Sequence, residues 1–280
     1  TPRKLSGPFA DELIAGGYIQ RYSIFSFFAL PLFLKLKQPY LSFFLAIIFV
    51  IFFVSIILSG NRMPLLLFLF SIFLVILFEK KIRKYIFSIV TTVFVIFIIA
   101  YLSNKQIKIN FDHFSRNIDN IVSIFLVDTG IKKQETFKGK VPLYYQEFRS
   151  FYETWKLNKF IGGGVKSYRE NCKKRRAISS YEREECNTHP HNYYLEIISD
   201  IGLVGLLIVL ALFSMTIYRS FVQNYKYSDY SNKVIIAVLF VFITEIIPFR
   251  SSGSFFTTGN ASFIFFLLAI LLGSIKKYKH

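Results

Sequence analysis

Residues 39–58, PYLSFFLAIIFVIFFVSIIL, form a run of twenty side chains that carry no charge and include five phenylalanines. A helix of about 20 such residues spans the hydrocarbon core of a bilayer. A weaker run at 13–34 is interrupted by Gln20 and Arg21, so we expect a short or irregular membrane segment there. Further apolar runs lie at 64–78, 84–102, 201–218, 234–249 and 261–275. Together they predict an all-α polytopic membrane protein with about six or seven membrane helices.

The basic residues of the short connections indicate which side of the membrane each connection faces. One set of connections and the C-terminal tail hold twelve Lys and Arg residues: Lys35, Lys37, Lys80, Lys81, Arg83, Lys84, Arg219, Lys226, Lys233, Lys276, Lys277 and Lys279. The opposite turns hold only Arg62 and Arg250. Basic short loops stay in the cytoplasm. We therefore expect Arg62, Arg250 and the long polar segment between the helices to face the periplasm or the exterior.

This topology divides the chain into three regions. Residues 1–102 form an N-terminal membrane region, 103–200 a large periplasmic loop, and 201–280 a C-terminal membrane region. The net charge of +17 belongs partly to the cytoplasmic clusters, where anionic membrane lipids are the expected partners. The external loop is also basic, which favours phosphates, lipid headgroups or acidic glycans as partners, and nucleic acid is not expected there. A charge that only keeps the loop solvated is the alternative. Because the chain begins at Thr1 in a loop-like stretch, we expect it to be the C-terminal part of a longer protein.

Within the loop, aromatic residues recur every three or four positions from 143 to 159. This spacing predicts an amphipathic helix, which lies either against the membrane or against the core of the loop itself. The glycines at 162–164 precede Lys166 and Ser167, but their spacing does not match that of a phosphate-binding loop. A turn that allows the backbone to approach another segment closely is the better interpretation.

The two cysteines, Cys172 and Cys186, both lie in this loop. In an oxidising compartment two such residues favour a disulfide. Closing a loop of this length stabilises the folded state by roughly 3 kcal/mol in the chain-entropy model. The alternative is a zinc site formed with His189 and His191, since two thiolates and two imidazoles are suitable ligands. The compartment and the long spacer disfavour zinc.

The segment THPHN at 188–192 stands where the loop returns to the membrane. His191 can accept a proton near neutral pH and so can activate a hydroxyl group. A histidine pair with no role beyond its place at the interface is the equal alternative. Arginines bind phosphates through two parallel hydrogen bonds, and the external candidates are Arg62, Arg149, Arg169 and Arg250. Glu245 is a candidate ion-pair partner for Arg250.

At these residues the chain resembles the O-antigen ligase family. His191-Asn192, nine residues, then Gly202-Leu203-Val204-Gly205 is similar to the family signature His-Asn-x9-Gly-x-x-Gly. Arg62 followed by Leu66 resembles its Arg-x-x-x-Leu motif, and Arg149 resembles its second essential arginine. The resemblance implies a GT-C-like fold and a glycosyltransferase that needs no metal and no other cofactor. Its donor would be a glycan on undecaprenyl diphosphate, and its acceptor a hydroxyl group of lipid A–core, of another glycan or of a protein.

The resemblance also implies roles for individual residues. His191 would act as the general base, and Arg62 and Arg149 would hold the donor diphosphate in an inverting displacement. Asn192, His189, Arg169 and Arg250 would support substrate binding. O-antigen polymerases and bacterial O-oligosaccharyltransferases share the same motifs. A transporter of lipid-linked glycans is disfavoured because the predicted helices are nearly free of charge, and a purely structural membrane protein would leave Arg62 and His191 without a role.

Overall fold

Every regular element in the described part of the chain is a helix. The computed structural model describes residues 14–33, 38–59, 62–103, 105–128, 130–131, 143–174, 186, 191–226, 233–248, 250 and 253–275. The helices are α1 (Ala15–Phe33), α2 (Gln38–Leu58), α3 (Arg62–Phe78), α4 (Lys80–Ser103), α5 (Lys105–Asp128), α6 (Leu143–Trp155), α7 (Tyr168–Cys172), α8 (Tyr193–Lys226), α9 (Lys233–Glu245) and α10 (Thr258–Ser274). The all-α class predicted from the sequence is confirmed for these residues.

The helices follow the apolar runs closely, with three informative differences. The segment at 13–34 is not irregular, because α1 is a continuous helix of 19 residues. Helix α9 ends at Glu245, four residues before the run at 234–249 ends. Helix α5 has 24 residues in a stretch whose polar sequence gave no clear periodicity.

One described helix meets the length and composition of a membrane span on its own. It covers Tyr193–Val222 within α8, and an 18-residue stretch of it has a mean hydropathy of 2.5. Shorter apolar helices lie at Phe43–Leu58, Met63–Phe78, Val234–Glu245 and Thr258–Ser274. The predicted total of six or seven spans, and the division of the chain into membrane and periplasmic regions, stay predictions.

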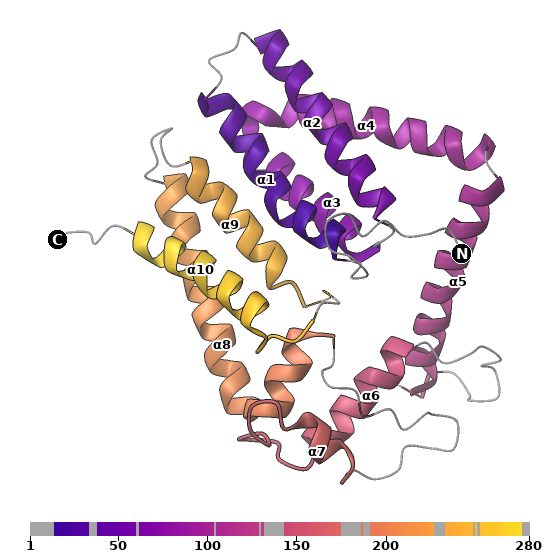
Figure 1. Cartoon of the computed structure of the whole chain (residues 1–280), viewed down its shortest axis with the longest axis vertical. Helices are drawn as coiled ribbons and strands as arrows, with labels where there is room; N and C mark the ends of the chain where they lie inside the picture. The colour runs from indigo at the N-terminus through magenta and orange to yellow at the C-terminus, as the bar shows by residue number, and fades with distance from the viewer. Residues whose placement is uncertain are drawn as a thin grey trace. The chain divides into compact units, whose positions relative to one another are not determined.

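The chain forms two compact units. Unit 1 comprises Thr1–Thr92, Val209–Ser252 and Thr257–His280. In it α1 packs against α2, α3 and α9, and α9 packs against α10 (Figure 1). The Phe28 and Phe240 rings meet edge to face inside this unit, whereas Phe43 and Phe73 on its surface are more than half exposed. Large exposed phenylalanines on apolar helices suit a surface that faces lipid rather than water.

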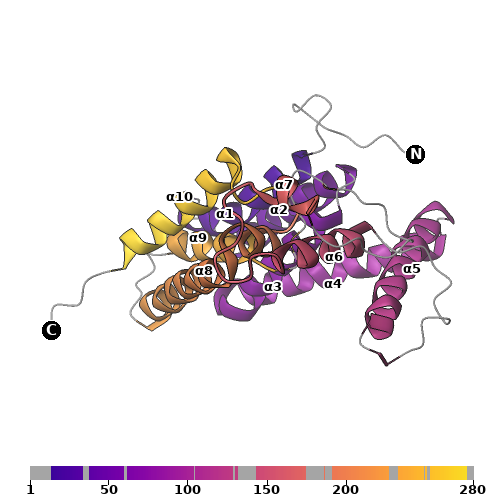
Figure 2. The ribbon, with the colours of Figure 1, turned by 90° about the horizontal axis from the view of Figure 1, so that it is seen from below.

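Unit 2 comprises Val93–Ile208 and Gly253–Phe256. Its α6 and α7 lie side by side (Figures 1 and 2). Their contact is a face-to-face stack of Phe151 on Tyr168, with an angle of 10° between the rings, and both side chains are buried. Helix α6 therefore buries Phe151 in the core of its own unit, whereas Phe148 and Tyr152 on the same helix are exposed. Both packings considered for residues 143–159 stay open.

Helix α8 is broken at Gly202, where the backbone has φ 70° and ψ −173°. The chain at 159–164 crosses this break and hydrogen-bonds to both sides of it. Gly163 N–H and Gly164 N–H donate to the carbonyls of Ser199 and Asp200 over 3.1 and 2.8 Å. In return, Leu203 N–H and Val204 N–H donate to the carbonyls of Lys159 and Phe160 over 2.9 and 3.1 Å. The loop thus replaces the hydrogen bonds that the helix loses at its break.

Two glycines make this crossing possible. A Cβ atom at Gly162 would overlap the carbonyl of Asp200, and one at Gly202 would overlap the carbonyl of Phe160. Both glycines also have a positive φ, 72° and 70°, which side-chain-bearing residues rarely adopt. The turn at 162–164 therefore serves close backbone approach to α8.

We expect Gly162→Ala to destabilise unit 2 strongly, because its Cβ would meet backbone atoms that cannot rotate away. The left-handed conformation alone costs about 1–2 kcal/mol, and overpacking adds about 1–3 kcal/mol. Thermal unfolding of the purified protein in detergent measures the loss. Gly259→Ala is the matched control, since Gly259 has open space around it; equal stability of the two variants would contradict the crossing.

Candidate functional site

The start of α8 is fixed by the side chain of Asn192. Its Oδ1 accepts hydrogen bonds from Tyr194 N–H at 3.0 Å and from Leu195 N–H at 3.2 Å. Its main-chain carbonyl accepts the first helical bond, from Glu196 N–H at 3.1 Å. This is the N-cap arrangement, in which a side chain satisfies amides that have no partner within the helix. Helix α8 therefore begins at Tyr193, eight residues before the apolar run at 201–218.

His191 precedes this cap in an uncommon backbone conformation. Its φ is 50°, a region that few residues other than glycine occupy and where histidine is enriched. Such conformations carry strain and cluster at functional sites. The residue is partly exposed, so a substrate can reach it. The backbone here leads directly into a capped helix, which restrains where the imidazole begins.

The first turn of α8 also holds a buried carboxylate that the sequence analysis missed. Glu196 accepts a hydrogen bond from Ser254 Oγ at 2.5 Å and another from Phe255 N–H. The ring of Phe255 meets Tyr193 edge to face, and all four residues are buried. Glu196 therefore ties the 253–256 segment to the helix that follows His191. The available signal was an acidic residue in the first turn of an otherwise apolar helix.

Asp200, in the last turn before the break, has a similar connecting role. Its Oδ2 accepts Lys166 N–H at 2.6 Å, and Lys166 itself has a φ of 61°. Gly163 N–H and Gly164 N–H also donate to α8. Three amide groups of this glycine-rich turn therefore already have acceptors on that helix. A bound phosphate would have to displace them, so the geometry agrees with the rejection of a phosphate-binding loop.

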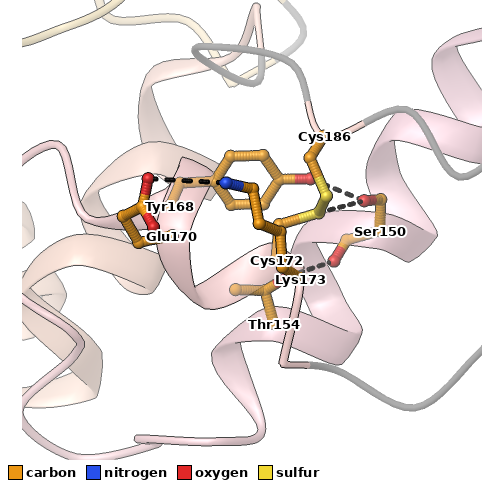
Figure 3. The surroundings of a disulfide bond; sticks show 7 residues. All are labelled: Ser150, Thr154, Tyr168, Glu170, Cys172, Lys173 and Cys186. Atoms are coloured by element: carbon orange, nitrogen blue, oxygen red, sulfur yellow. Dashed lines mark hydrogen bonds and ion pairs between the residues drawn. A yellow bond between two sulfur atoms is a disulfide. The ribbon is translucent and has the colours of Figure 1, made fainter.

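Cys172 and Cys186 form a disulfide beside Tyr168 (Figure 3). Phe151, which stacks on Tyr168, belongs to the same buried cluster. The Ser150 hydroxyl lies 2.5 Å from the Tyr168 hydroxyl and 3.7 Å from Cys172 Sγ. The disulfide therefore lies against α6 and α7, and it uses both cysteines that a zinc site would need. Among the described residues, no cluster of His, Cys, Asp and Glu has the composition of a metal site.

Two of the four candidate arginines belong to the same unit as His191. Arg149 lies partly buried on α6, and Arg169 lies exposed on α7. Arg62 is the first residue of α3 in unit 1. The Arg62 side chain and His189 lie outside the described residues.

Arg250, the fourth arginine, is part of a buried ion network in unit 1. Its Nη1 lies 2.5 Å from Glu245 Oε1, the pairing considered from the sequence. Arg21 binds the same carboxylate from α1, with both of its hydrogen bonds at 3.1 Å, and donates a third to Asn260 at 2.9 Å. Since the Glu245 side chain is fully buried, its negative charge would destabilise the fold without these cationic partners. In the sequence Arg21 stands out only as an interruption of an apolar run, although a charge in such a run implies a partner.

We expect Asn192→Ala to lower stability by about 1 kcal/mol, the usual cost of losing an N-cap. Asn192→Ser should retain most of it, because a serine hydroxyl accepts the same amide bonds. Thermal unfolding followed by circular dichroism distinguishes the two variants. If alanine and serine were equally harmful, the side chain would act through something other than the cap.

A comparison with models of protein families identifies one match. The model described as O-antigen ligase covers residues 47–210. This range includes α3, the described loop helices, the disulfide, the His191-Asn192 junction and both glycines of the signature. A search among curated proteins finds no match. The matched range exceeds half of the 280 residues, and the chain therefore belongs to the O-antigen ligase family, whose members are membrane-integral bacterial enzymes with glycosyltransferase-like ligase or polymerase activity.

Proposed function

We propose that this protein transfers a glycan from undecaprenyl diphosphate to an acceptor hydroxyl group, at the periplasmic face of the bacterial inner membrane. The observation that carries the proposal is the junction at His191. A histidine in a left-handed conformation stands directly before a capped membrane helix, inside the segment that matches the O-antigen ligase family. This junction provides a proton acceptor at a membrane surface, where a lipid-linked donor presents its reactive end.

In the proposed reaction the acceptor oxygen attacks the anomeric carbon of the donor sugar. The new bond forms as the bond from that carbon to the diphosphate oxygen breaks. The proton of the attacking hydroxyl passes to the imidazole of His191. The electron pair of the broken bond leaves on the diphosphate, which stays attached to the polyprenyl chain. Because the acceptor displaces the leaving group directly, the anomeric configuration is inverted.

The diphosphate leaving group gains negative charge in the transition state, so cations placed beside it accelerate its departure. Arg62 and Arg149 are proposed for this role, because guanidinium groups stay protonated and bind phosphate oxygens in pairs. Arg169 and His189 are proposed as supporting substrate contacts. Arg250 is the weakest candidate, since it is buried and already paired with Glu245. No metal or other cofactor is part of the scheme.

The proposed acceptor is lipid A–core, which makes the enzyme a ligase. A growing lipid-linked glycan would make it a polymerase, and a protein would make it an O-oligosaccharyltransferase. These three reactions share the same donor chemistry at His191, so the acceptor alone separates them. The test is therefore transfer in vitro by the purified full-length protein, with one donor and the three acceptor classes offered in turn.

We expect His191→Ala and Arg62→Ala each to reduce transfer by at least about 100-fold, as loss of a general base or of a leaving-group cation usually does. Both variants should remain folded, with the disulfide intact. Glycan transfer is measured on gels or by mass spectrometry. His113→Ala and Arg116→Ala are the matched controls, since both residues lie on α5 and neither is assigned a role. Near-wild-type transfer by His191→Ala or Arg62→Ala would refute this mechanism.

A further inference from the structure

The loop that crosses α8 exposes large apolar side chains in place of burying them. Phe160 is 67% exposed, Ile161 77% and Val165 56%. Leu157, at the start of the same loop, is also exposed. A water-soluble loop of nine residues, 157–165, rarely presents four such side chains together, and an apolar patch of this kind marks a surface that contacts another apolar phase.

The same loop is joined to the apolar surface of the membrane helix. The backbone bonds from Leu203 to Lys159 and from Val204 to Phe160 place the exposed residues directly beside α8. On that helix Val204, Leu207 and Ile208 are each at least half exposed. All of these residues belong to unit 2. The patch is therefore a lateral extension of the surface by which α8 contacts lipid.

The depth of the loop follows from the length of the helix. Arg219 is the first charged residue that follows the apolar stretch of α8, 15 positions after Val204 (219 minus 204). At 1.5 Å per residue this separation is about 22 Å along the helix, less than the hydrocarbon thickness of about 30 Å. With Arg219 at one boundary of the hydrocarbon, Val204 lies several Å inside the opposite boundary. Phe160, whose carbonyl binds Val204, lies at the same depth.

The residues that precede the patch suit the boundary between lipid and water. Trp155 donates its indole N–H to the Lys159 carbonyl at 2.9 Å, and Lys156 lies 4.5 Å over the ring of Tyr152. Tryptophan, tyrosine and lysine are the residues that concentrate at this boundary. Along the chain from Tyr152 to Ile161, side chains typical of the lipid–water boundary are therefore followed by apolar side chains.

We propose that the 157–165 loop inserts into the bilayer beside α8, with Phe160, Ile161 and Val165 in contact with lipid acyl chains. Irregular backbone is tolerated at this depth where protein satisfies its polar groups, and the hydrogen bonds to the broken helix do so for Lys159, Phe160, Gly163 and Gly164. The loop would anchor unit 2 to the membrane next to the helix that begins after His191. This inference depends on the membrane span of α8 and not on the catalytic scheme.

The test uses the single tryptophan of the chain. In a Trp155→Phe background, Ile161→Trp places the only indole in the patch, and the protein is reconstituted in phosphatidylcholine vesicles. We expect emission at a shorter wavelength than that of a Glu170→Trp control, which reports an exposed position on α7 in the same unit. We also expect strong quenching by lipids brominated along the acyl chain and weak quenching by iodide. Iodide quenching equal to that of the control, without lipid quenching, would overturn the proposal.

A second measurement needs no substitution. A photoactivatable carbene carried on a lipid acyl chain should label the wild-type protein in the tryptic peptide 160–166, which ends at Lys166. If the Ile161→Trp variant does not form the disulfide, and so has not folded, the labelling of the wild-type protein tests the insertion in its place. A peptide 160–166 that stays unlabelled while peptides of α8 are labelled would overturn the insertion. Neither result depends on glycan transfer, so failure of the proposed function and failure of this inference remain distinguishable.

Discussion

The most consequential constraint in this protein is the need to satisfy backbone hydrogen bonds where α8 breaks at Gly202. A helix interrupted near a bilayer exposes amides and carbonyls that lipid cannot solvate. The 159–164 loop supplies the missing partners on both sides of the break. The crossing requires glycine at 162 and at 202, since each Cβ would occupy the space of the other backbone. The loop and the helix are consequently one structural element.

The candidate site is built outward from that element. Asp200 holds Lys166 one turn before the break, and Glu196 holds Ser254 and Phe255 one turn earlier. Asn192 then caps the helix, which leaves His191 as the residue where the chain turns into it. Each connection restrains the short helical segment between His191 and Gly202. If His191 acts as the general base, as proposed, it gains from such restraint because its position is established before the substrate arrives.

The spacing between His191-Asn192 and Gly202 has a physical explanation in these contacts. The intervening residues form the helical segment from the cap to the break, and Glu196 and Asp200 on this segment connect it to two other parts of unit 2. One residue inserted between Glu196 and Asp200 would rotate one carboxylate by about 100° around the helix axis relative to the other. The sequence motif therefore describes a length and a rotation as well as residue types.

The sequence alone determined the helical class and most helix boundaries, because burial of apolar runs depends on residues close together in the chain. It also indicated that the glycine turn allows close approach, although not to which segment. Only the tertiary structure identified Gly202 as the partner of Gly162, Glu196 as a site residue and Arg21 as the second cation on Glu245. These contacts join residues between 40 and 224 positions apart, and which distant groups meet depends on the path of the whole chain rather than on local propensity.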